Sequence, residues 1–135
     1  MKQHPPEIAA FLASGSFAVV GASADRAKYG NKVLRCYQQH GLPVVAVNPK
    51  GAAVEGAPGY ASLRDVPEDV RAVSVVAPPV AAAAIVADAR ARGISHLWFQ
   101  PGAEDEAAIA AALRGDMNVI AGGPCLLVAL GFRDA

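Results

Sequence analysis

The sequence has no excess of charge of either sign and very little cysteine. Its 12 lysines and arginines balance 12 aspartates and glutamates, and the isoelectric point is about 6.8. A nucleic-acid-binding protein usually carries a basic excess, so the composition argues against a nucleic-acid partner. Two cysteines, Cys36 and Cys125, are too few for a disulfide framework or a zinc site.

Long apolar runs are also missing. No stretch approaches the ~20 uninterrupted apolar residues of a membrane span, so no membrane partner is expected. The N-terminal residues MKQHPPEIAAFLASG contain a proline pair and lack the apolar run of a secretory signal. Hydrophobic residues make up 53% of the chain and charged residues only 18%, which excludes a disordered chain. We expect one cytoplasmic domain over residues 1–135.

Short apolar runs alternate with alanine-rich helical stretches along the chain. Five runs predict strands, and 48–59, rich in glycine and proline, predicts a loop. The strands are expected at 17–20, 44–47, 72–76, 96–99 and 118–121, and the helices at 6–13, 29–40, 80–92, 104–114 and 124–130. In the fourth helix, Glu104, Asp105 and Glu106 are expected in the first turn. The alternation predicts an α/β fold: a single doubly wound Rossmann-like domain with a five-stranded, mainly parallel sheet and helices on both faces.

Ligands of such sheets bind beyond the carboxyl ends of the strands, so the residues that follow each strand are the candidate site. After the first strand, Gly21 permits a tight turn, and the following helix N-terminus suits phosphate. Ser23 adds a hydroxyl donor, and Arg26 and Lys28 add positive charge. Ser23 stands where a dinucleotide fingerprint would have its second glycine, so that fingerprint is broken. An ordinary strand-to-helix turn with capping residues is the alternative.

After the second strand come Asn48, Pro49 and Lys50, with no carboxylate. An NAD-binding domain often has an acidic residue here, which binds the ribose hydroxyls. A lysine suits a ribose that carries an extra phosphate, which leaves NADP or another phosphorylated adenosine. An exposed loop lysine without a ligand is the alternative.

Prolines, which restrict the backbone, follow the third strand, and a segment with a glycine, which frees the backbone, follows the fourth. Pro78 and Pro79 form a rigid apolar ledge that could pack against an adenine or a pantetheine arm, although Pro79 would also simply start a helix. Gln100, Pro101 and Gly102 follow the fourth strand, and Gly102 allows close approach.

Cys125 follows a Gly-Gly-Pro turn near a helix start, where the dipole can lower a thiol pKa. No activating base lies nearby in the sequence, so a buried packing cysteine is the favoured interpretation. The three histidines show no metal-ligand spacing. Trp98 and Cys36 are expected in the core.

Taken in order, these segments resemble the small CoA-binding proteins of bacteria and archaea. They are also similar to the CoA-binding N-terminal domain of the succinyl-CoA synthetase α subunit, and the resemblance covers nearly the whole chain. Its marks are VVGAS (19–23), KYGNKV (28–33), VNPKG (47–51), YASLRDVP (60–67), LWFQPG (97–102) and GPC (123–125). The residues before Cys125, Ala121 to Pro124, are less polar than that family's pattern.

The resemblance implies a coenzyme A site along the strand ends. The segment 23–26 would hold phosphate, Lys50 would meet the phosphorylated adenosine end, and Pro78 and Pro79 would flank the ligand. The implied binding residues are Gly21, Ala22, Ser23, Ala24, Asp25, Arg26, Lys28, Asn48, Pro49, Lys50, Pro78, Pro79, Gln100, Pro101 and Gly102.

The expected function is therefore binding of coenzyme A or an acyl-CoA, with the information passed to a protein partner. The sequence shows no paired carboxylates, Ser-His-Asp set or metal cluster, and we expect no domain like that in which the synthetase phosphorylates a histidine. A ligand-binding module is thus favoured over a self-sufficient enzyme. The alternatives are an NADP-dependent oxidoreductase, a nucleotide-binding regulatory domain and a redox protein that uses Cys125.

Overall fold

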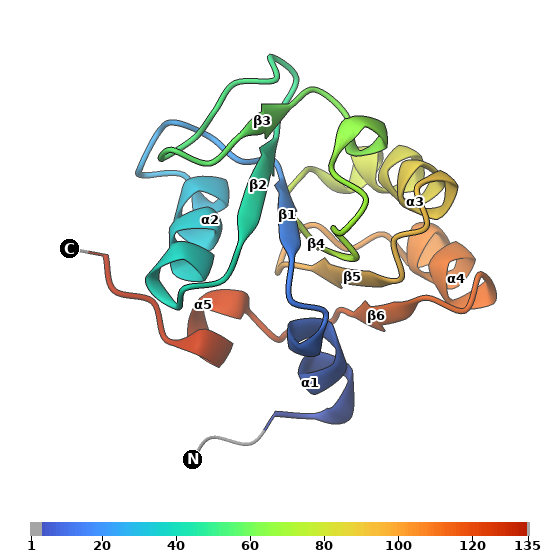
Figure 1. Ribbon diagram of the computed structural model, residues 1–135. Coiled ribbons are helices and arrows are strands. Elements are labelled where there is room, and N and C mark those ends of the chain that lie inside the picture. The colour runs from blue at the N-terminus through green and yellow to red at the C-terminus, as the bar shows by residue number, and fades with distance from the viewer. Residues whose placement is uncertain (1–3, 135) are drawn as a thin grey trace.

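A parallel sheet covered by helices on both faces organises the chain (Figure 1). The computed structural model describes residues 4–134. Residues 1–3 and 135 lie outside the described part, and a single domain over 1–135 stays a prediction. The elements in chain order are α1 (Pro6–Ala13), β1 (Phe17–Val20), α2 (Tyr29–Gln39), β2 (Val44–Val47), β3 (Gly59–Tyr60), the 3₁₀ turn η1 (Leu63–Asp65), β4 (Ala72–Val75), the 3₁₀ turn η2 (Pro79–Ala81), α3 (Ala82–Ala91), β5 (His96–Phe99), α4 (Glu106–Arg114), β6 (Asn118–Ile120) and α5 (Leu126–Leu130).

The strands follow the order β3-β2-β1-β4-β5-β6, and every neighbouring pair is parallel. The chain builds β1, β2 and β3 outward in one direction. It then returns to the other side of β1 to add β4, β5 and β6. The predicted doubly wound Rossmann-like α/β fold is therefore confirmed, and the strand order reverses between β1 and β4. Ligands of open α/β sheets bind at such a reversal.

The sheet has six strands where the sequence predicts five. The additional strand, β3, has only two residues: Gly59, the last residue of the expected 48–59 loop, and Tyr60, which follows it. Backbone hydrogen bonds hold it to β2: Ala46 N–H donates to Pro58 O at 2.8 Å, and Asn48 N–H donates to Tyr60 O at 3.0 Å. A side-chain pattern cannot show so short a strand, because alternation needs at least four residues.

Local contacts shift several element ends from their expected places. Asp105 precedes α4 as its N-cap and accepts from Ala108 N–H at 2.9 Å. Glu104 lies outside the helix as well, and its carboxylate accepts from Gly102 N–H at 2.8 Å. The expected 80–92 helix begins as η2 and continues as α3, and the last helix starts at Leu126 rather than at Pro124.

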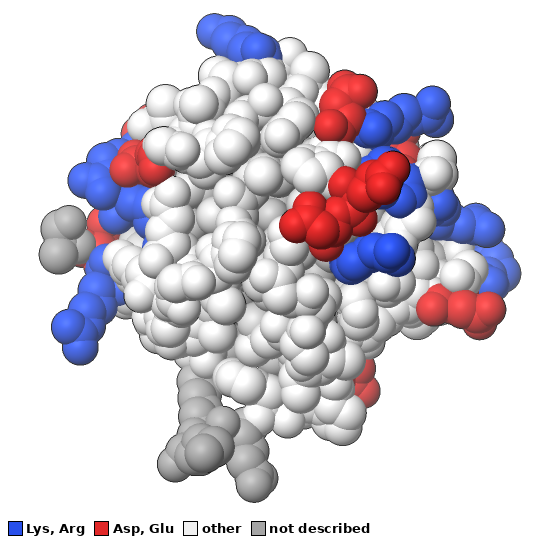
Figure 2. Space-filling model, in the orientation of Figure 1, with Lys and Arg blue, Asp and Glu red and all other residues white. Residues whose placement is uncertain are grey.

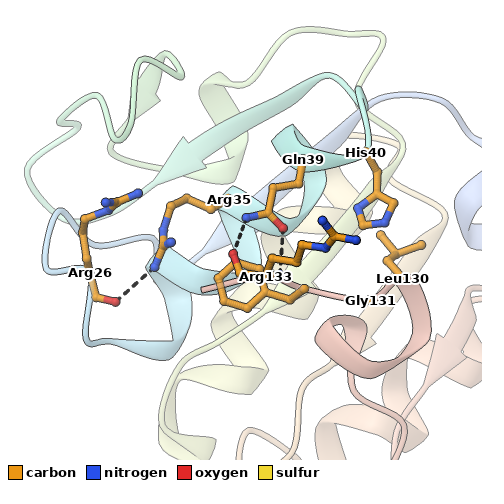
Figure 3. Close-up of a pocket in the computed structure, with 8 residues that line it drawn as sticks. Arg26, Arg35, Gln39, His40, Leu130, Gly131 and Arg133 are labelled. Atoms are coloured by element: carbon orange, nitrogen blue, oxygen red, sulfur yellow. Dashed lines mark hydrogen bonds between the residues drawn. The ribbon is translucent and has the colours of Figure 1, made fainter. Parts of the chain in front are cut away.

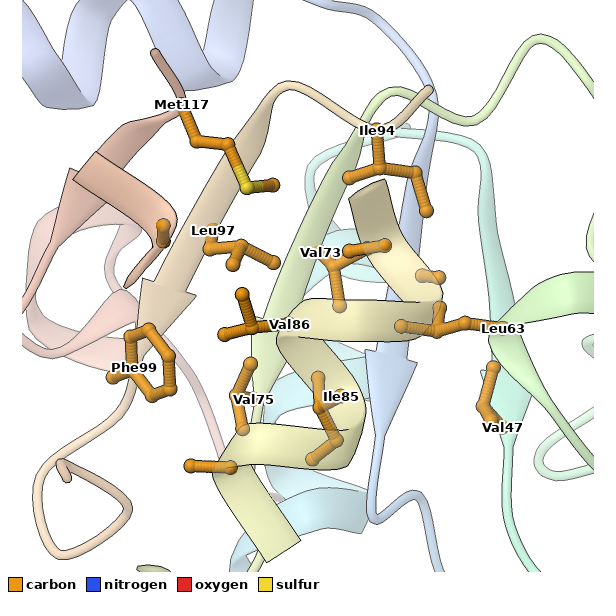
Figure 4. Packing of buried hydrophobic residues seen from close by; sticks show 14 of the residues in the cluster. Val47, Leu63, Val73, Val75, Ile85, Val86, Ile94, Leu97, Phe99 and Met117 are labelled. Atoms are coloured by element: carbon orange, nitrogen blue, oxygen red, sulfur yellow. The ribbon is translucent and has the colours of Figure 1, made fainter. Parts of the chain in front are cut away.

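Two hydrophobic clusters, one on each face of the sheet, form the core. The face under α3 and α4 is mostly aliphatic, as Figure 4 shows for Val73, Val86 and Leu97. The opposite face, under α1, α2 and α5, is aromatic. There Phe11 meets Trp98 edge-on at 5.3 Å, and Phe17 stacks on Tyr37 at 4.7 Å. We refer to these as the α3/α4 face and the α2 face.

On the face shown in Figure 2, acidic and basic side chains lie near one another toward the edges and a broad central area carries neither, so no field of one sign develops there. In the structure, Arg64 Nε and Asp88 Oδ1 form an ion pair at 2.9 Å. None of the helices in the described part of the chain has the length and apolar character that crossing a membrane requires.

Candidate functional site

A pocket of about 510 Å³ lies at the carboxyl edge of the sheet, between the loop after β1 and the loop after β2. It is lined by Gly21, Ala22, Ser23, Ala24, Asp25, Lys28, Asn48, Pro49, Lys50, Ala52 and Val54. The structure therefore brings together the two segments that the sequence singles out after the first and second strands. Parallel strands end at the same edge of a sheet, which is why segments so far apart in sequence meet.

A second pocket, of about 260 Å³, adjoins the first at the reversal of strand order. Its walls are Val76, Ala77, Pro78, Pro101, Gly102 and Ala103, none of them charged. Gly21 of the first pocket lies against Val76 of the second. A Cβ on Gly21 would lie 1.7 Å from the Val76 carbonyl oxygen, and Gly21 has a φ of +94°. Glycine is required there for both reasons.

The β1–α2 loop is shaped by its own short side chains. Ser23 Oγ accepts from Asp25 N–H at 3.1 Å, and Asp25 Oδ1 accepts from Ala27 N–H at 3.0 Å. The loop leads into α2, whose first turn offers unpaired N–H groups and the positive end of the helix dipole. This combination is suited to an anionic group.

Two lysines stand on opposite walls of the larger pocket. Lys28 precedes α2 and Lys50 follows β2, and both are exposed. Within residues 4–134, neither ammonium group forms an ion pair or hydrogen bond. Two unpaired cations across a pocket at a helix N-terminus favour a phosphorylated ligand over a neutral one.

Three residues of the predicted set do not line either pocket. Arg26 turns away, and its Nε lies 3.3 Å from Glu55 Oε2. Pro79 is exposed at the start of η2. Gln100 is fully buried: its Oε1 accepts from Leu126 N–H at 3.0 Å and from the Tyr29 hydroxyl at 3.2 Å.

Arg26 instead borders a third pocket, of about 750 Å³, between α2 and the C-terminal segment (Figure 3). There Gln39 bonds both backbone groups of Arg133, as acceptor from its N–H at 3.0 Å and as donor to its carbonyl at 2.6 Å. Arg35 Nη2 lies 3.1 Å from Asp134 Oδ1. Two of its three arginines, Arg26 and Arg35, already pair with Glu55 and Asp134, which makes this pocket a poorer anion site than the first.

Cys125 is half-buried, and its Sγ lies 2.5 Å from the Tyr29 hydroxyl oxygen. Burial, followed by the hydrogen bond to Cys125, raises the pKa of Tyr29, so the phenol keeps its proton at neutral pH. The hydroxyl can then donate to Gln100 while the thiol donates to the hydroxyl. Cys125 lines neither of the two strand-end pockets. Cys36 and Trp98 are fully buried, as predicted.

Two residues that the sequence analysis did not single out connect the two loops around the first strand-end pocket, the one of about 510 Å³. Asn31 is fully buried in α2, and its Nδ2 donates to Ser23 O at 2.8 Å and to Glu55 Oε2 at 3.1 Å. From sequence alone, an asparagine within a helix is expected at the surface, and Glu55 is expected in a polar turn. Only their meeting in space shows what they connect.

Comparison with known proteins places these features in a family. Residues 15–131 match the CoA binding domain. Over 61 residues, 45% of the chain, the sequence is 38% identical to the ADP-forming acetate–CoA ligase I of Archaeoglobus fulgidus. The chain spans only 9% of that ligase's length.

The chain is also similar in fold and sequence to several solved structures. A conserved hypothetical protein from Pyrococcus furiosus is 36% identical with a TM-score of 0.78, over 84% of this chain and 97% of that one. A hypothetical protein from Pyrococcus horikoshii is 26% identical with a TM-score of 0.85, over 96% and 95%. The dinucleotide-forming acetyl-coenzyme A synthetase 1 of Candidatus Korarchaeum cryptofilum is 26% identical with a TM-score of 0.71, over 79% of this chain and 25% of that one. With its family match extending over most of its length, the chain belongs to the CoA binding domain family.

Proposed function

We propose that the protein binds coenzyme A at the carboxyl edge of its sheet, across the two adjoining pockets. The observation that carries the proposal is the close contact of Gly21, which lines the first pocket, with Val76, which lines the second, together with two lysines in the first pocket and uncharged walls in the second. Coenzyme A has the same division: a phosphorylated adenosine and a diphosphate at one end, and a pantetheine arm at the other.

The diphosphate would lie against the 21–28 loop and the N-terminus of α2. Lys28 would add charge there, and the backbone N–H groups of the first helical turn would donate to phosphate oxygens. Lys50 would meet the 3′-phosphate of the ribose. Asn48 fixes the shape of that loop, because its side chain bonds both backbone groups of Ala52 at 2.9 Å.

The pantetheine arm would continue past Gly21 into the smaller pocket, between Pro78 and the 101–103 segment. Pro78 offers an apolar surface there. Gln100 would support this wall from behind through its bonds to Tyr29 and Leu126, rather than bind the ligand itself. In this proposal the protein is a ligand-binding module that acts through a protein partner.

The proposal is tested by measuring calorimetrically how Lys50→Ala changes the affinity for coenzyme A and for dephospho-CoA, which lacks only the 3′-phosphate. Because Lys50 is exposed and its charge is screened, the loss for coenzyme A should be about threefold to tenfold. Dephospho-CoA should bind the variant and the wild type almost equally. Such a cycle isolates the lysine–phosphate contact from general damage to the loop.

Lys32→Ala is the matched control, since Lys32 pairs with Asp134 at 3.4 Å, outside both strand-end pockets. It should leave both affinities unchanged. If Lys50→Ala lowered the affinity for coenzyme A and for dephospho-CoA equally, Lys50 would not contact the 3′-phosphate. Tighter binding of NADP than of coenzyme A would overturn the proposal in favour of a dinucleotide site.

A further inference from the structure

Glu55 has a backbone conformation that glutamate rarely adopts. Its φ is +49°, and within residues 4–134 the only other non-glycine residue with a positive φ is Asp116, at +60°. Left-handed backbone disfavours a residue with a Cβ, and persists where the surrounding contacts hold it. Glu55 lies at the tip of a turn closed by paired backbone hydrogen bonds between Val54 and Ala57, at 3.1 and 2.8 Å.

The contacts that hold Glu55 all come from the β1–α2 loop and from α2. Its carboxylate accepts from Asn31 Nδ2 at 3.1 Å and pairs with Arg26 Nε at 3.3 Å. Its backbone carbonyl accepts from Gln38 Nε2 at 2.9 Å. The β2–β3 loop, which carries Lys50, is thus joined to the β1–α2 loop and to α2.

Asn31 is the centre of this connection. Its Nδ2 also donates to Ser23 O, and its Oδ1 accepts from Arg35 Nε at 2.6 Å. Arg35 Nη2 in turn donates to Arg26 O at 3.3 Å (Figure 3). Asn31 is fully buried and Arg35 is 4% exposed, so the geometry of these bonds is set by packing. We call the contacts of Glu55 with Asn31 and Arg26 the Glu55 clasp.

We propose that Glu55 is a positioning residue for the strand-end pocket: its clasp sets the separation of the two walls and thereby the affinity for a phosphorylated ligand. This inference rests on the proposed function. A loop that is already ordered loses less conformational freedom when the ligand binds, so the clasp strengthens binding without contacting the ligand. Pairing with Glu55 also partly neutralises Arg26, and leaves Lys28 and Lys50 as the basic side chains that line the pocket, beside the carboxylate of Asp25.

The test compares Glu55→Asn with Asp116→Asn. Both variants remove one carboxylate, and both place asparagine, which tolerates positive φ, at a left-handed position. Only Glu55→Asn shortens the side chain that reaches Asn31 and Arg26. Its affinity for coenzyme A should fall on the order of fivefold, while that of Asp116→Asn should change less than twofold. The melting temperatures should agree to within about 3 °C, because an exposed ion pair contributes little to stability.

The sign of the change separates the clasp from simple electrostatics. Removing a negative charge near an anion site should by itself tighten coenzyme A binding. The clasp predicts weaker binding. Unchanged or tighter binding by Glu55→Asn would therefore overturn the inference, provided that the wild type binds coenzyme A.

Hydrogen exchange of the free protein tests, without any ligand, whether the Glu55 clasp orders the β2–β3 loop. In Glu55→Asn the amides of Ala52 and Val54, which bond Asn48 Oδ1 and Ala57 O, should exchange at least threefold faster than in the wild type. The amide of Ala89 in α3 should not change. Unchanged exchange in the loop would refute the clasp even if coenzyme A binds. A wild type that binds no coenzyme A would refute the proposed function, while the exchange rates would still show whether the clasp orders the loop.

Discussion

The two faces of the sheet are packed in different ways. Under α3 and α4, small aliphatic side chains such as Val73 and Val86 fill the space, with Phe99 as the buried aromatic residue and Tyr60 packed against the cluster. On the α2 face the packing is aromatic and mixed with polar groups. Every buried polar side chain in the described part of the chain lies in α2 or bonds to it: Asn31, Arg35, Ser74 and Gln100.

This difference indicates what each face does. The α3/α4 face contributes mainly stability through packing, although Ala77 and Ala103 of its cluster also line the smaller pocket, and its helices could be repacked with other aliphatic residues of similar volume. The α2 face also holds the loops around the strand-end pockets, through Asn31 on one side and through Tyr29 and Gln100 on the other. A change on the α2 face should therefore alter the pockets, whereas a change on the other face, away from Ala77 and Ala103, should alter stability only.

The largest effect is expected at two neighbours on β5 that point to opposite faces. Trp98 and Leu97 are both fully buried. Trp98→Ala should lower the free energy of unfolding by about 3–5 kcal/mol. Leu97→Ala should lower it less, by an amount toward the low end of about 2–5 kcal/mol. Urea unfolding measures both.

The same pair tests the link to the loops. Trp98 Nε1 donates to Pro124 O at 3.0 Å and so holds the segment before Cys125. Alkylation of Cys125 under native conditions should be faster in Trp98→Ala than in Leu97→Ala, because only the first frees that segment. Equal labelling rates in the two variants would contradict the proposed difference between the faces.

A smaller effect is expected at Tyr37, whose hydroxyl lies 2.6 Å from Ser74 Oγ in the core of the α2 face. Tyr37→Phe leaves a buried hydroxyl without its partner and should cost about 1–3 kcal/mol. Adding Ser74→Ala removes that hydroxyl as well and should recover part of the loss. A double variant that is less stable than Tyr37→Phe would contradict this account of the pair.

The smallest effect concerns pH and Cys36. Burial, with a contribution from Cys125, raises the pKa of the Cys36 thiol from 9.0 to about 11. Above pH 9 the unfolded chain loses this proton while the folded chain keeps it, so unfolding releases a proton and stability falls as pH rises. The loss between pH 9 and pH 10 should be about 1 kcal/mol.

Urea midpoints at pH 8, 9 and 10 would show this loss, and Cys36→Ala should remove most of it. The buried tyrosines Tyr29 and Tyr37, whose pKa values burial also raises, add to the slope mainly above pH 10. An identical alkaline slope in Cys36→Ala would exclude the thiol as its cause.

Much of the fold could be predicted from local patterns. Four-residue apolar runs such as 17–20 and 44–47 coincide with β1 and β2, because strands of a sheet that is covered on both faces are largely apolar. The meeting of the 21–28 and 48–50 segments follows from parallel strands alone. The strand β3 could not be predicted, because backbone hydrogen bonds to β2 define it and its two residues, Gly59 and Tyr60, are too few to form a side-chain pattern.

The candidate site was predictable only as far as main-chain topology determines it. Gln100 follows a strand, as a binding residue would, but its side chain turns inward to bond Tyr29 and Leu126. Arg26 has the positive charge that binds phosphate, but its Nε pairs with Glu55 Oε2 and it lines neither strand-end pocket. Both outcomes depend on side chains distant in sequence, which no local pattern contains. Whether the remaining residues bind coenzyme A stays a prediction.

The contact of Gly21 with Val76 also limits how this protein could be changed by evolution or design. Gly30 closes the same point from the other side, since a Cβ on it would lie 2.0 Å from the Gly21 carbonyl oxygen. The floor between the two pockets is therefore made of main-chain atoms, which substitution does not exchange. New ligand preferences must arise in the walls, at positions such as Lys50, Ala52 and Pro78. Libraries that vary these positions and leave both glycines intact should yield folded proteins with altered selectivity.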